Sequence, residues 1–298
     1  MYMKIWGGKI AFVVVSAALF LGGIFFYEQG RFFDGKFHVV FCDVGQGDAI
    51  FLRTPRGVDI LVDGGPNDSV LSCLSRHMPF WDKTIELVLL THPHADHFTG
   101  LIDVLDRYTV IAFNTEKLAN NTTGFRHFSE KFKAGKTKSR FVSTGDTFRT
   151  KDGVVLYVLS PSRAFLSATA PEGIISESGE FASLVLIVSF GTLDVLLSGD
   201  SQIDGLREAL GGQLPPIEVF QVPHHGSKNG LNETLLEALR PRVAVISVGK
   251  NNRYGHPHSE ILRKLGDQNV RIFRTDRDGE VEVVSDGEKW HVSSSRKR

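Results

Sequence analysis

The chain has 298 residues, enough for one large α/β domain or two small ones. Hydrophobic residues make up 42% and charged residues 23%, ordinary values that allow a substantial core. The 34 basic residues balance the 34 acidic ones, so the net charge gives no sign of nucleic-acid binding, although a neutral total does not exclude a local basic groove. Cys42 and Cys73 are too few for a disulfide framework or a thiolate metal site, and we expect Cys42, in an apolar run, to be a buried thiol.

The N-terminus carries an uncharged apolar run, IAFVVVSAALFLGGIFFY, at residues 10–27. As a helix this run would be about 27 Å long, enough to cross a bilayer core. We expect residues 1–27 to be a membrane anchor, because the run is long for a cleaved signal peptide, which remains the alternative. Lys4 and Lys9 precede the run, whereas after it the acids Glu28 and Asp34 offset Arg31 and Lys36. The excess of positive charge before the run favours an N-terminus inside the cytoplasm and a domain outside it.

The rest of the chain reads as one domain at residues 37–290, after a short polar linker at 28–36. Apolar runs bounded by glycine and other turn residues predict strands at 37–43, 48–54, 57–65, 85–91, 154–161, 183–190, 193–200, 217–223, 242–248 and 270–275. Apolar residues near helical spacing predict helices at 95–108, 202–210, 233–240 and 259–265. Residues 114–140 are less regular and rich in basic side chains, and residues 291–298 are predicted to be a disordered tail.

The strongest candidate site directly follows the predicted strand 85–91. Four potential metal ligands lie within six residues there: His92, His94, Asp96 and His97. Neutral imidazole and carboxylate groups suit divalent zinc, manganese or iron. In so short a loop, alternate side chains can diverge toward two metals, and structural histidines seldom cluster in this way. The sequence therefore predicts a metal centre.

The pattern His-x-His-x-Asp-His resembles the signature of the metallo-β-lactamase superfamily. Further motifs resemble the C-terminal hydrolase domain of the competence-type DNA-uptake channel proteins: DVGQGD (43–48), LSGD (197–200), PHHGS (223–227), YGHPH (254–258) and RTDRDGEVEV (274–283). The resemblance covers about residues 37–285. It implies an α/β fold, the αβ/βα four-layer sandwich, preceded here by one transmembrane helix.

The resemblance also implies a dinuclear centre of zinc or manganese ions. Its ligands would be His92, His94, Asp96, His97, Asp200 and His225. His92 and His94 would hold the first metal, Asp96, His97 and His225 the second, and Asp200 would bridge the two ions. The broader superfamily places one more histidine on the first metal, but this chain has none between His127 and His224. Ser183 or a water could take that place, and the weaker site would make manganese plausible beside zinc.

Other polar residues are expected around the metals: Asp48, Asp63, Ser183, His224, Ser227 and Lys228. Asp48 and Asp63 lie at strand–turn junctions, where a carboxylate either accepts the spare N–H of a ligating histidine or stabilises its own turn. Asp96 and His256 are the candidate catalytic groups. Asp96 would orient the attacking water, and His256 would donate to a phosphate oxygen or to the leaving group.

The expected function is metal-dependent hydrolysis, because two metal ions can activate water and stabilise an in-line displacement. The resemblance implies that the substrate is a phosphodiester, most plainly DNA, since the similar proteins are nucleases that act on DNA. The basic stretch 114–140 could neutralise a phosphate backbone, or could be ordinary surface. The alternatives are a cyclic-nucleotide phosphodiesterase, a thioesterase or a lactamase, or a non-catalytic membrane-anchored DNA-binding subunit. One hydrophobic span cannot enclose a pore, so a DNA channel would have to be a separate membrane protein.

Overall fold

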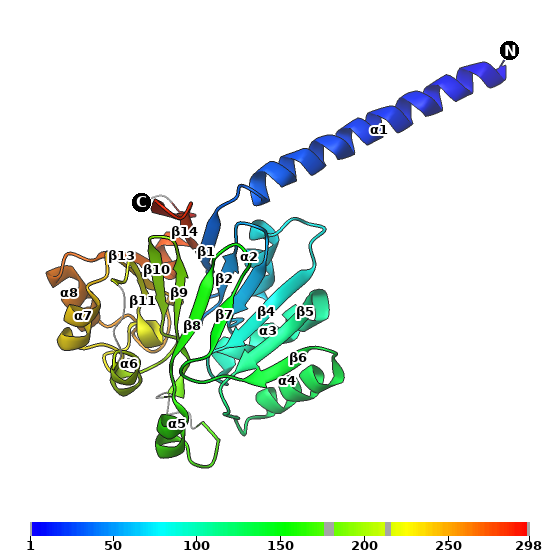
Figure 1. Ribbon diagram of the computed structural model, residues 1–298. Helices are drawn as coiled ribbons and strands as arrows, with labels where there is room; N and C mark the ends of the chain where they lie inside the picture. Colours follow the sequence, from blue (N-terminus) through cyan, green and yellow to red (C-terminus); the bar gives the residue numbers. More distant parts are fainter. Residues whose placement is uncertain (1, 176–181, 212–215, 297–298) are drawn as a thin grey trace.

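Two β-sheets pack face to face and helices cover their outer faces in the computed structural model of this chain (Figure 1). The structure describes residues 2–175, 182–211 and 216–296. The strand order is β15-β14-β1-β2-β3-β4-β5-β6 in the first sheet and β13-β12-β11-β10-β9-β8-β7 in the second. This layering confirms the predicted four-layer sandwich.

The first sheet contains β1 (Phe37–Phe41), β2 (Ile50–Arg53), β3 (Asp59–Val62), β4 (Thr84–Leu90), β5 (Thr109–Thr115), β6 (Lys138–Phe141), β14 (Val281–Ser285) and β15 (Trp290–Ser294). The second contains β7 (Thr147–Arg149), β8 (Val155–Ser160), β9 (Val185–Phe190), β10 (Leu193–Leu197), β11 (Val219–Gln221), β12 (Val243–Ile246) and β13 (Arg271–Arg274). The helices are α1 (Tyr2–Phe32), α2 (Ser69–His77), α3 (Ala95–Arg107), α4 (Thr123–Ala134), α5 (Arg163–Thr169), α6 (Ile203–Ala209), α7 (Glu233–Leu239), α8 (Ser259–Asp267) and α9 (Thr275–Asp278).

Central strands are apolar on both faces because each face packs on a different layer. In β1, Val39 and Phe41 enter the core between the two sheets, whereas Val40 packs beneath α2 and α3. In β10, Val195 belongs to the same inter-sheet core and Leu196 packs beneath the helices of the other half. Successive strand side chains point to opposite faces, so burial on both sides gives continuous apolar runs.

Strand direction fixes where polar loops can meet. Strands β3 to β6 are parallel, and so are β10 to β13. The carboxyl ends of neighbouring parallel strands lie at the same edge of a sheet, where binding sites are usually built. The loops that follow β4, β10 and β11 therefore can converge.

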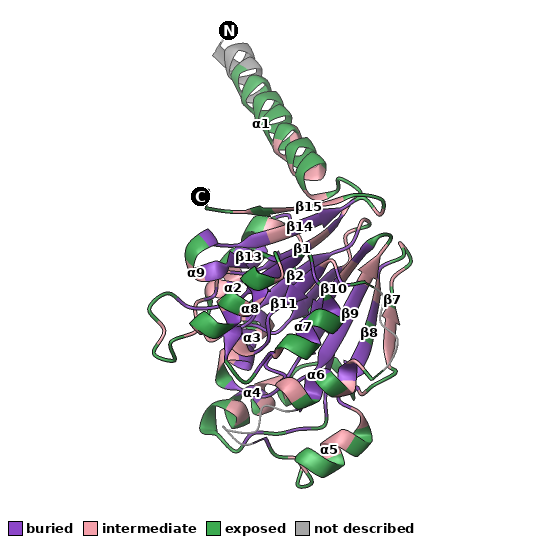
Figure 2. Cartoon of the chain, turned by 90° about the vertical axis from the view of Figure 1, so that its left-hand side faces the viewer, coloured by how far each residue is buried: buried purple, intermediate pink, exposed green. Residues whose placement is uncertain are grey.

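Helix α1 projects from the domain (Figure 2). Its segment Ala11–Phe32 is long and apolar enough to cross a membrane. The helix continues to Phe32, so the prediction of a linker over 28–36 is wrong for its first half. Residues 28–32 contain no proline to stop the helix, and the Nε of Arg53 donates to the carbonyl of Phe32, satisfying a helix-end acceptor (3.1 Å).

The C-terminal residues are more ordered than predicted. Strand β15 runs to Ser294 and pairs antiparallel with β14, so the prediction of a disordered tail over 291–298 is wrong for its first part. Trp290 and Val292 alternate toward the inter-sheet core, which gives the strand a half-buried apolar face. The guanidinium of Arg296 then reaches the carboxylate of Asp43 at 2.8 Å. Residues 297–298 lie outside the described residues.

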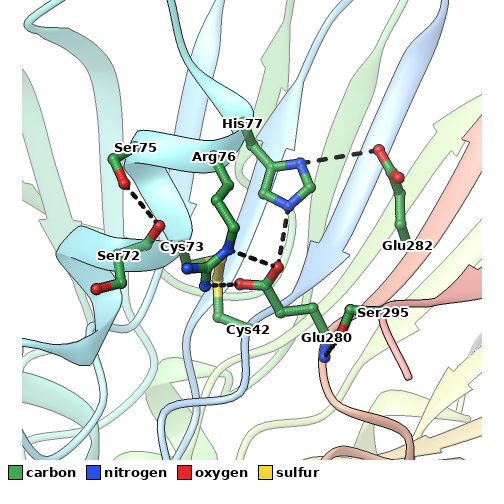
Figure 3. The surroundings of a disulfide bond; sticks show 9 residues. All are labelled: Cys42, Ser72, Cys73, Ser75, Arg76, His77, Glu280, Glu282 and Ser295. Carbon is green, nitrogen blue, oxygen red and sulfur yellow. Dashed lines mark hydrogen bonds and ion pairs between the residues drawn. A yellow bond between two sulfur atoms is a disulfide. The ribbon is translucent and has the colours of Figure 1, made fainter. Parts of the chain in front are cut away.

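A disulfide joins Cys42 to Cys73, 31 residues apart, so the expected buried thiol at Cys42 is wrong (Figure 3). It ties the end of β1 to α2. Beside it, Glu280 accepts hydrogen bonds from Arg76 and lies 3.3 Å from the Nε2 of His77. Burial alone would raise the pKa of Glu280, but these two neighbours outweigh it and lower that pKa to about 2. Disulfides persist mainly outside the reducing cytoplasm.

Candidate metal centre

The predicted ligands come from both sheets. His92 and His94 lie in the loop after β4, and Asp96 and His97 occupy the first turn of α3. Asp200 follows β10, and His225 lies in a short 3₁₀ segment, Pro223–Gly226, after β11. The structure thus brings together residues more than 100 positions apart.

The backbone around His225 is held in an unusual conformation. Its φ is 55° and that of His224 is 50°, in the left-handed region that non-glycine residues rarely adopt. Gly226 follows with φ 84°, and a Cβ there would lie 2.5 Å from the Cβ of Pro257. Such local strain is typical of functional sites, where the surrounding structure fixes it.

Four side chains converge on one point: Asp96, His97, Asp200 and His225, whose ligand atoms all lie within 4.8 Å of one another. The Oδ1 of Asp200 is 3.4 Å from the Nε2 of His97 and 3.6 Å from that of His225. The Oδ2 of Asp96 is 3.4 Å from the same nitrogen of His225. These residue types are the ones that bind zinc and related divalent ions.

Within the described ranges, three of these buried atoms have no hydrogen-bond partner: the Nε2 of His97, the Nε2 of His225 and the Oδ1 of Asp200. Buried polar atoms are nearly always satisfied. The two imidazole nitrogens each lie less than 4 Å from the Asp200 oxygen, and this arrangement fits a cation placed between the three atoms.

The other oxygen of Asp200 faces a second group. Its Oδ2 is 3.8 Å from the Nε2 of His92 and 3.9 Å from that of His224. The ring of His94 is close by, with its Nδ1 3.1 Å from the Nε2 of His92. Asp200 therefore lies between the two sets of ligands that the sequence predicted for two metals.

Ser183 lies behind His92 and not beside the metal-facing nitrogen. Its Oγ is 3.4 Å from the Nδ1 of His92 and accepts the backbone N–H of Asp200 (3.2 Å). The Oγ1 of Thr91 contacts the same Nδ1 at 3.0 Å. Ser183 thus contacts both a predicted ligand histidine and the backbone of Asp200. A Cβ on Gly199, whose φ is +48°, would lie 2.3 Å from this Ser183 oxygen, so the loop requires glycine there.

The two aspartates predicted behind the histidines occupy different positions. Asp63 contacts the Nδ1 of His97 at 2.8 Å and accepts two hydrogen bonds from Thr91. Asp48 lies farther away, 4.0 Å from His97, and accepts from the Nε2 of Gln221 at 2.7 Å. The Nδ1 of His225 instead donates to the carbonyl of Ser247 (2.9 Å). A hydrogen bond at Nδ1 leaves Nε2 available as a ligand.

The protonation states of the metal-free protein differ between the two sets. Burial lowers the pKa of His225, but Asp200 and Asp96 outweigh it and raise that pKa to about 10. Burial also lowers the pKa of His97, and Asp200 and Asp63 raise it well above its usual range. His92 is different, because burial and the charge of His97 both hold its pKa well below normal. Binding at the Asp200–His225 set must therefore release protons.

A cavity of about 410 Å³ opens onto the cluster. It is lined by Gln46, His94, Ala95, Asp96, Asn120, Thr122, Asp200, His224, His225, Arg253, Tyr254 and His256. The Asp96 side chain is 34% exposed and faces this space. Burial and the charge of His225 lower the pKa of His256 to about 4, which keeps its imidazole neutral.

Ser227 and Lys228, which were predicted to lie around the metals, do not line the cavity. Ser227 is buried, and its backbone N–H closes a turn on His224. Lys228 is exposed, and its charge acts on Glu260 of α8. Conversely, sequence reasoning missed Gln46, Asn120, Thr122 and Tyr254 as lining residues. The amide of Asn120 donates to the carbonyl of Pro93 (2.9 Å) and so steadies the histidine loop, but Asn120 lies in an irregular stretch that carries no motif.

The lysines near the end of the basic stretch 114–140 lie away from the metal ligands, although Asn120 and Thr122 of the same stretch line the cavity. Lys131 pairs with Asp106 at 2.6 Å, in the last turn of α3, whereas Asp96 is in the first turn. A helix of 13 residues separates those ends by about 18 Å. The hydroxyl of Thr137 donates to the carbonyl of Val110, so the start of β6 also lies at the edge of the sheet opposite the site.

The fold and the clustered histidines and aspartates define a metallo-β-lactamase-type protein. Residues 42–250 match the model of the metallo-beta-lactamase superfamily, and the chain belongs to that family. It is 30% identical over 260 residues to ComE operon protein 3 of Bacillus subtilis, which covers 80% of this chain and 32% of that protein. It is 26% identical over 258 residues to recombination protein 2 of Haemophilus influenzae, with 85% and 29% covered.

The chain therefore spans about a third of the length of these curated relatives. Among solved structures, CmlA, a diiron β-hydroxylase from Streptomyces venezuelae, superposes with a TM-score of 0.51 at 15% identity, covering 87% of this chain and 54% of that one. This likeness shows the fold alone. The family membership and the competence-type relatives confirm the resemblance seen in the motifs.

Proposed function

We propose that this chain is a metal-dependent phosphodiesterase that cleaves DNA. The observation that carries the proposal is the position of Asp200. One of its oxygens faces His97 and His225, and the other faces His92 and His224. A carboxylate shared in this way is suited to hold two divalent ions.

Some residues of the site would hold metal ions, and others would act on the substrate. His92, His94, Asp96, His97, Asp200 and His225 would hold two divalent ions, zinc or manganese. Such ions supply a water of lowered pKa and the positive charge that stabilises the oxygens of an in-line displacement. The exposed side of Asp96 would orient the attacking water. His256 lines the same cavity with a neutral imidazole, so a ring N–H can be offered to the leaving oxygen.

The cavity favours an anionic substrate over a neutral one. Arg253 brings a permanent positive charge to its rim, and Asn120 and Thr122 add hydrogen-bonding side chains. The relatives carry the names of competence and recombination proteins, which supports DNA as the phosphodiester. A thioesterase or lactamase would use the same metal pair, so the substrate must be tested directly.

The test uses the full chain in detergent or nanodiscs, stripped of metal with a chelator and reloaded with zinc or manganese. Linear DNA, a small chromogenic phosphodiester, a thioester and a β-lactam are compared. We expect hydrolysis of both phosphodiesters, and Asp200→Asn should lose bound metal and activity together. Asp204→Asn, an exposed carboxylate on α6, is the matched control. Full metal content and turnover in Asp200→Asn, or cleavage of the thioester or lactam alone, would contradict the proposal.

We also propose that α1 is an uncleaved membrane anchor and that the hydrolase domain lies outside the cytoplasm, beside a separate channel protein. The uncharged span and the Cys42–Cys73 disulfide support this arrangement. The chain should sediment with membranes, and protease added to intact spheroplasts should degrade the domain. A soluble product beginning near residue 28 would identify a cleaved signal peptide instead.

A further inference from the structure

Two large aromatic side chains are exposed on the loop between α2 and β4. Phe80 is 64% exposed and Trp81 is 38% exposed. Their rings meet edge to face at 4.9 Å, and Trp81 also stacks on Phe25 of α1 at 5.4 Å. Exposed loops are usually polar, so an adjacent pair of exposed aromatics marks a contact surface.

The contact with Phe25 shows where this loop lies relative to the apolar span of α1. Phe25 belongs to the apolar span Ala11–Phe32, near its domain-proximal end, and its neighbours Phe26 and Tyr27 are also exposed. The first charged residue after the run is Glu28. If α1 crosses a bilayer, these aromatics lie at the boundary between acyl chains and headgroups, where tryptophan and tyrosine concentrate. Trp81, stacked on Phe25, lies at the same boundary.

The same edge of the domain carries exposed cations. Lys83 directly follows this loop, and its carbonyl accepts the N–H of Thr109 at the start of β5. Further exposed cations lie at that end of the sheet: Arg107, Lys133, Lys136 and Lys138. Of the nearby acids, Asp106 pairs with Lys131 and Asp82 accepts the backbone N–H of Thr84, while Glu130 of α4 is exposed. The cations therefore exceed the free carboxylates here.

We infer that this edge docks onto the bilayer that α1 enters. Phe80 and Trp81 insert at the acyl-chain boundary, and Lys83, Arg107, Lys136 and Lys138 face anionic phospholipid headgroups. The inference rests on the proposed membrane anchor. It also gives a role to the lysines at the end of the basic stretch, which lie at the opposite ends of α3 and β5 from the metal ligands. Clustered lysines and arginines beside a membrane span are attracted to anionic lipid surfaces.

The docked orientation would point the metal centre away from the membrane. Strand β4 starts at Thr84, next to the aromatic loop, and ends at Leu90, just before the histidine cluster. Seven residues of extended strand cover about 20 Å. The cavity would open toward the aqueous phase, at the opposite end of the sheet from the lipid headgroups.

The test uses the full chain in vesicles with brominated acyl chains, which quench nearby tryptophans. A variant with Trp6→Phe and Trp290→Phe leaves Trp81 as the only reporter. We expect strong quenching of Trp81, greater when phosphatidylglycerol replaces part of the phosphatidylcholine and weaker at high salt. In the matched control Trp81 is also changed to Phe and Phe141→Trp moves the reporter to the far end of β6, at a position that is 62% exposed. This reporter should not be quenched.

The variant Lys136→Glu/Lys138→Glu should reduce the phosphatidylglycerol-dependent part of the quenching and leave DNA cleavage unchanged. Loss of DNA cleavage with unchanged Trp81 quenching would assign the cations to nucleic acid and overturn the inference. Vesicle flotation separates the two proposals. A chain that floats without Trp81 quenching refutes the docking alone, whereas a chain that does not float refutes the anchor and the docking together.

Discussion

The disulfide between Cys42 and Cys73 allows a stability change to be worked out from the structure. The bond closes a loop of 31 residues, and both side chains are buried. Loop-closure entropy for that length gives about 3.7 kcal/mol of stabilisation at 25 °C. For a domain of this size, each kcal/mol corresponds to about 2–4 °C in Tm, so Cys42→Ala/Cys73→Ala should lower Tm by about 7–15 °C.

The assay is thermal unfolding of the full chain in nanodiscs, followed by intrinsic fluorescence with and without dithiothreitol. The reductant should lower the Tm of the wild-type protein and leave that of the double alanine variant unchanged. A double variant within about 2 °C of the wild type would refute the reasoning, since the loop would then contribute little to the entropy of the unfolded chain.

Three further predictions concern the site and the charge cluster beside the disulfide. Asp63→Asn should weaken metal binding about 10- to 100-fold, because Asp63 holds the ring of His97 in place. Competition with a chelator measures this affinity, and an unchanged affinity would contradict the prediction. Gly199→Ala should lower metal content and Tm because its Cβ would meet the Ser183 oxygen at 2.3 Å, and Ser183→Ala should partly restore both; a single variant as stable and metal-loaded as wild type would show that the loop yields. The Glu280 pKa is lowered from 4.5 to about 2, so its ion pairs stabilise the fold fully above pH 4.5 and lose that contribution as the pH falls toward 2. Glu280→Gln should flatten acid unfolding in this window, and a curve parallel to that of the wild type would assign the acid sensitivity to other groups.

Local patterns predicted much of the fold and of the metal ligands. The histidine cluster follows a buried strand, and both features are visible within about a dozen residues. Asp200 and His225 could be assigned only through the family motifs, because their approach to His97 depends on the packing of two sheets. Once the strands are placed, parallel order explains why these loops meet.

Other features depend on contacts that no short window contains. The Cys42–Cys73 bond requires α2 to pack across β1, and the polar composition of α2 hid that helix. Strand β15 exists because β14 offers it a free edge and a core for Trp290. Lys228 follows the PHHGS motif directly, and for that reason it was expected near the metals. The turn that contains His225 instead places the charge of Lys228 near Glu260 of α8. In each case tertiary packing decided what the sequence left open.

The division of the ligands between two sheets determines when, during folding, the metal site can form. The histidine cluster belongs to the first half, while Asp200 and His225 arrive with the second, and neither half alone assembles the four converging side chains. The set of converging ligands is therefore complete only once the two halves have closed on each other. Under the proposed function, a chain that crossed the membrane unfolded would cleave no DNA before it crossed, and would gain activity only after it had folded on the far side.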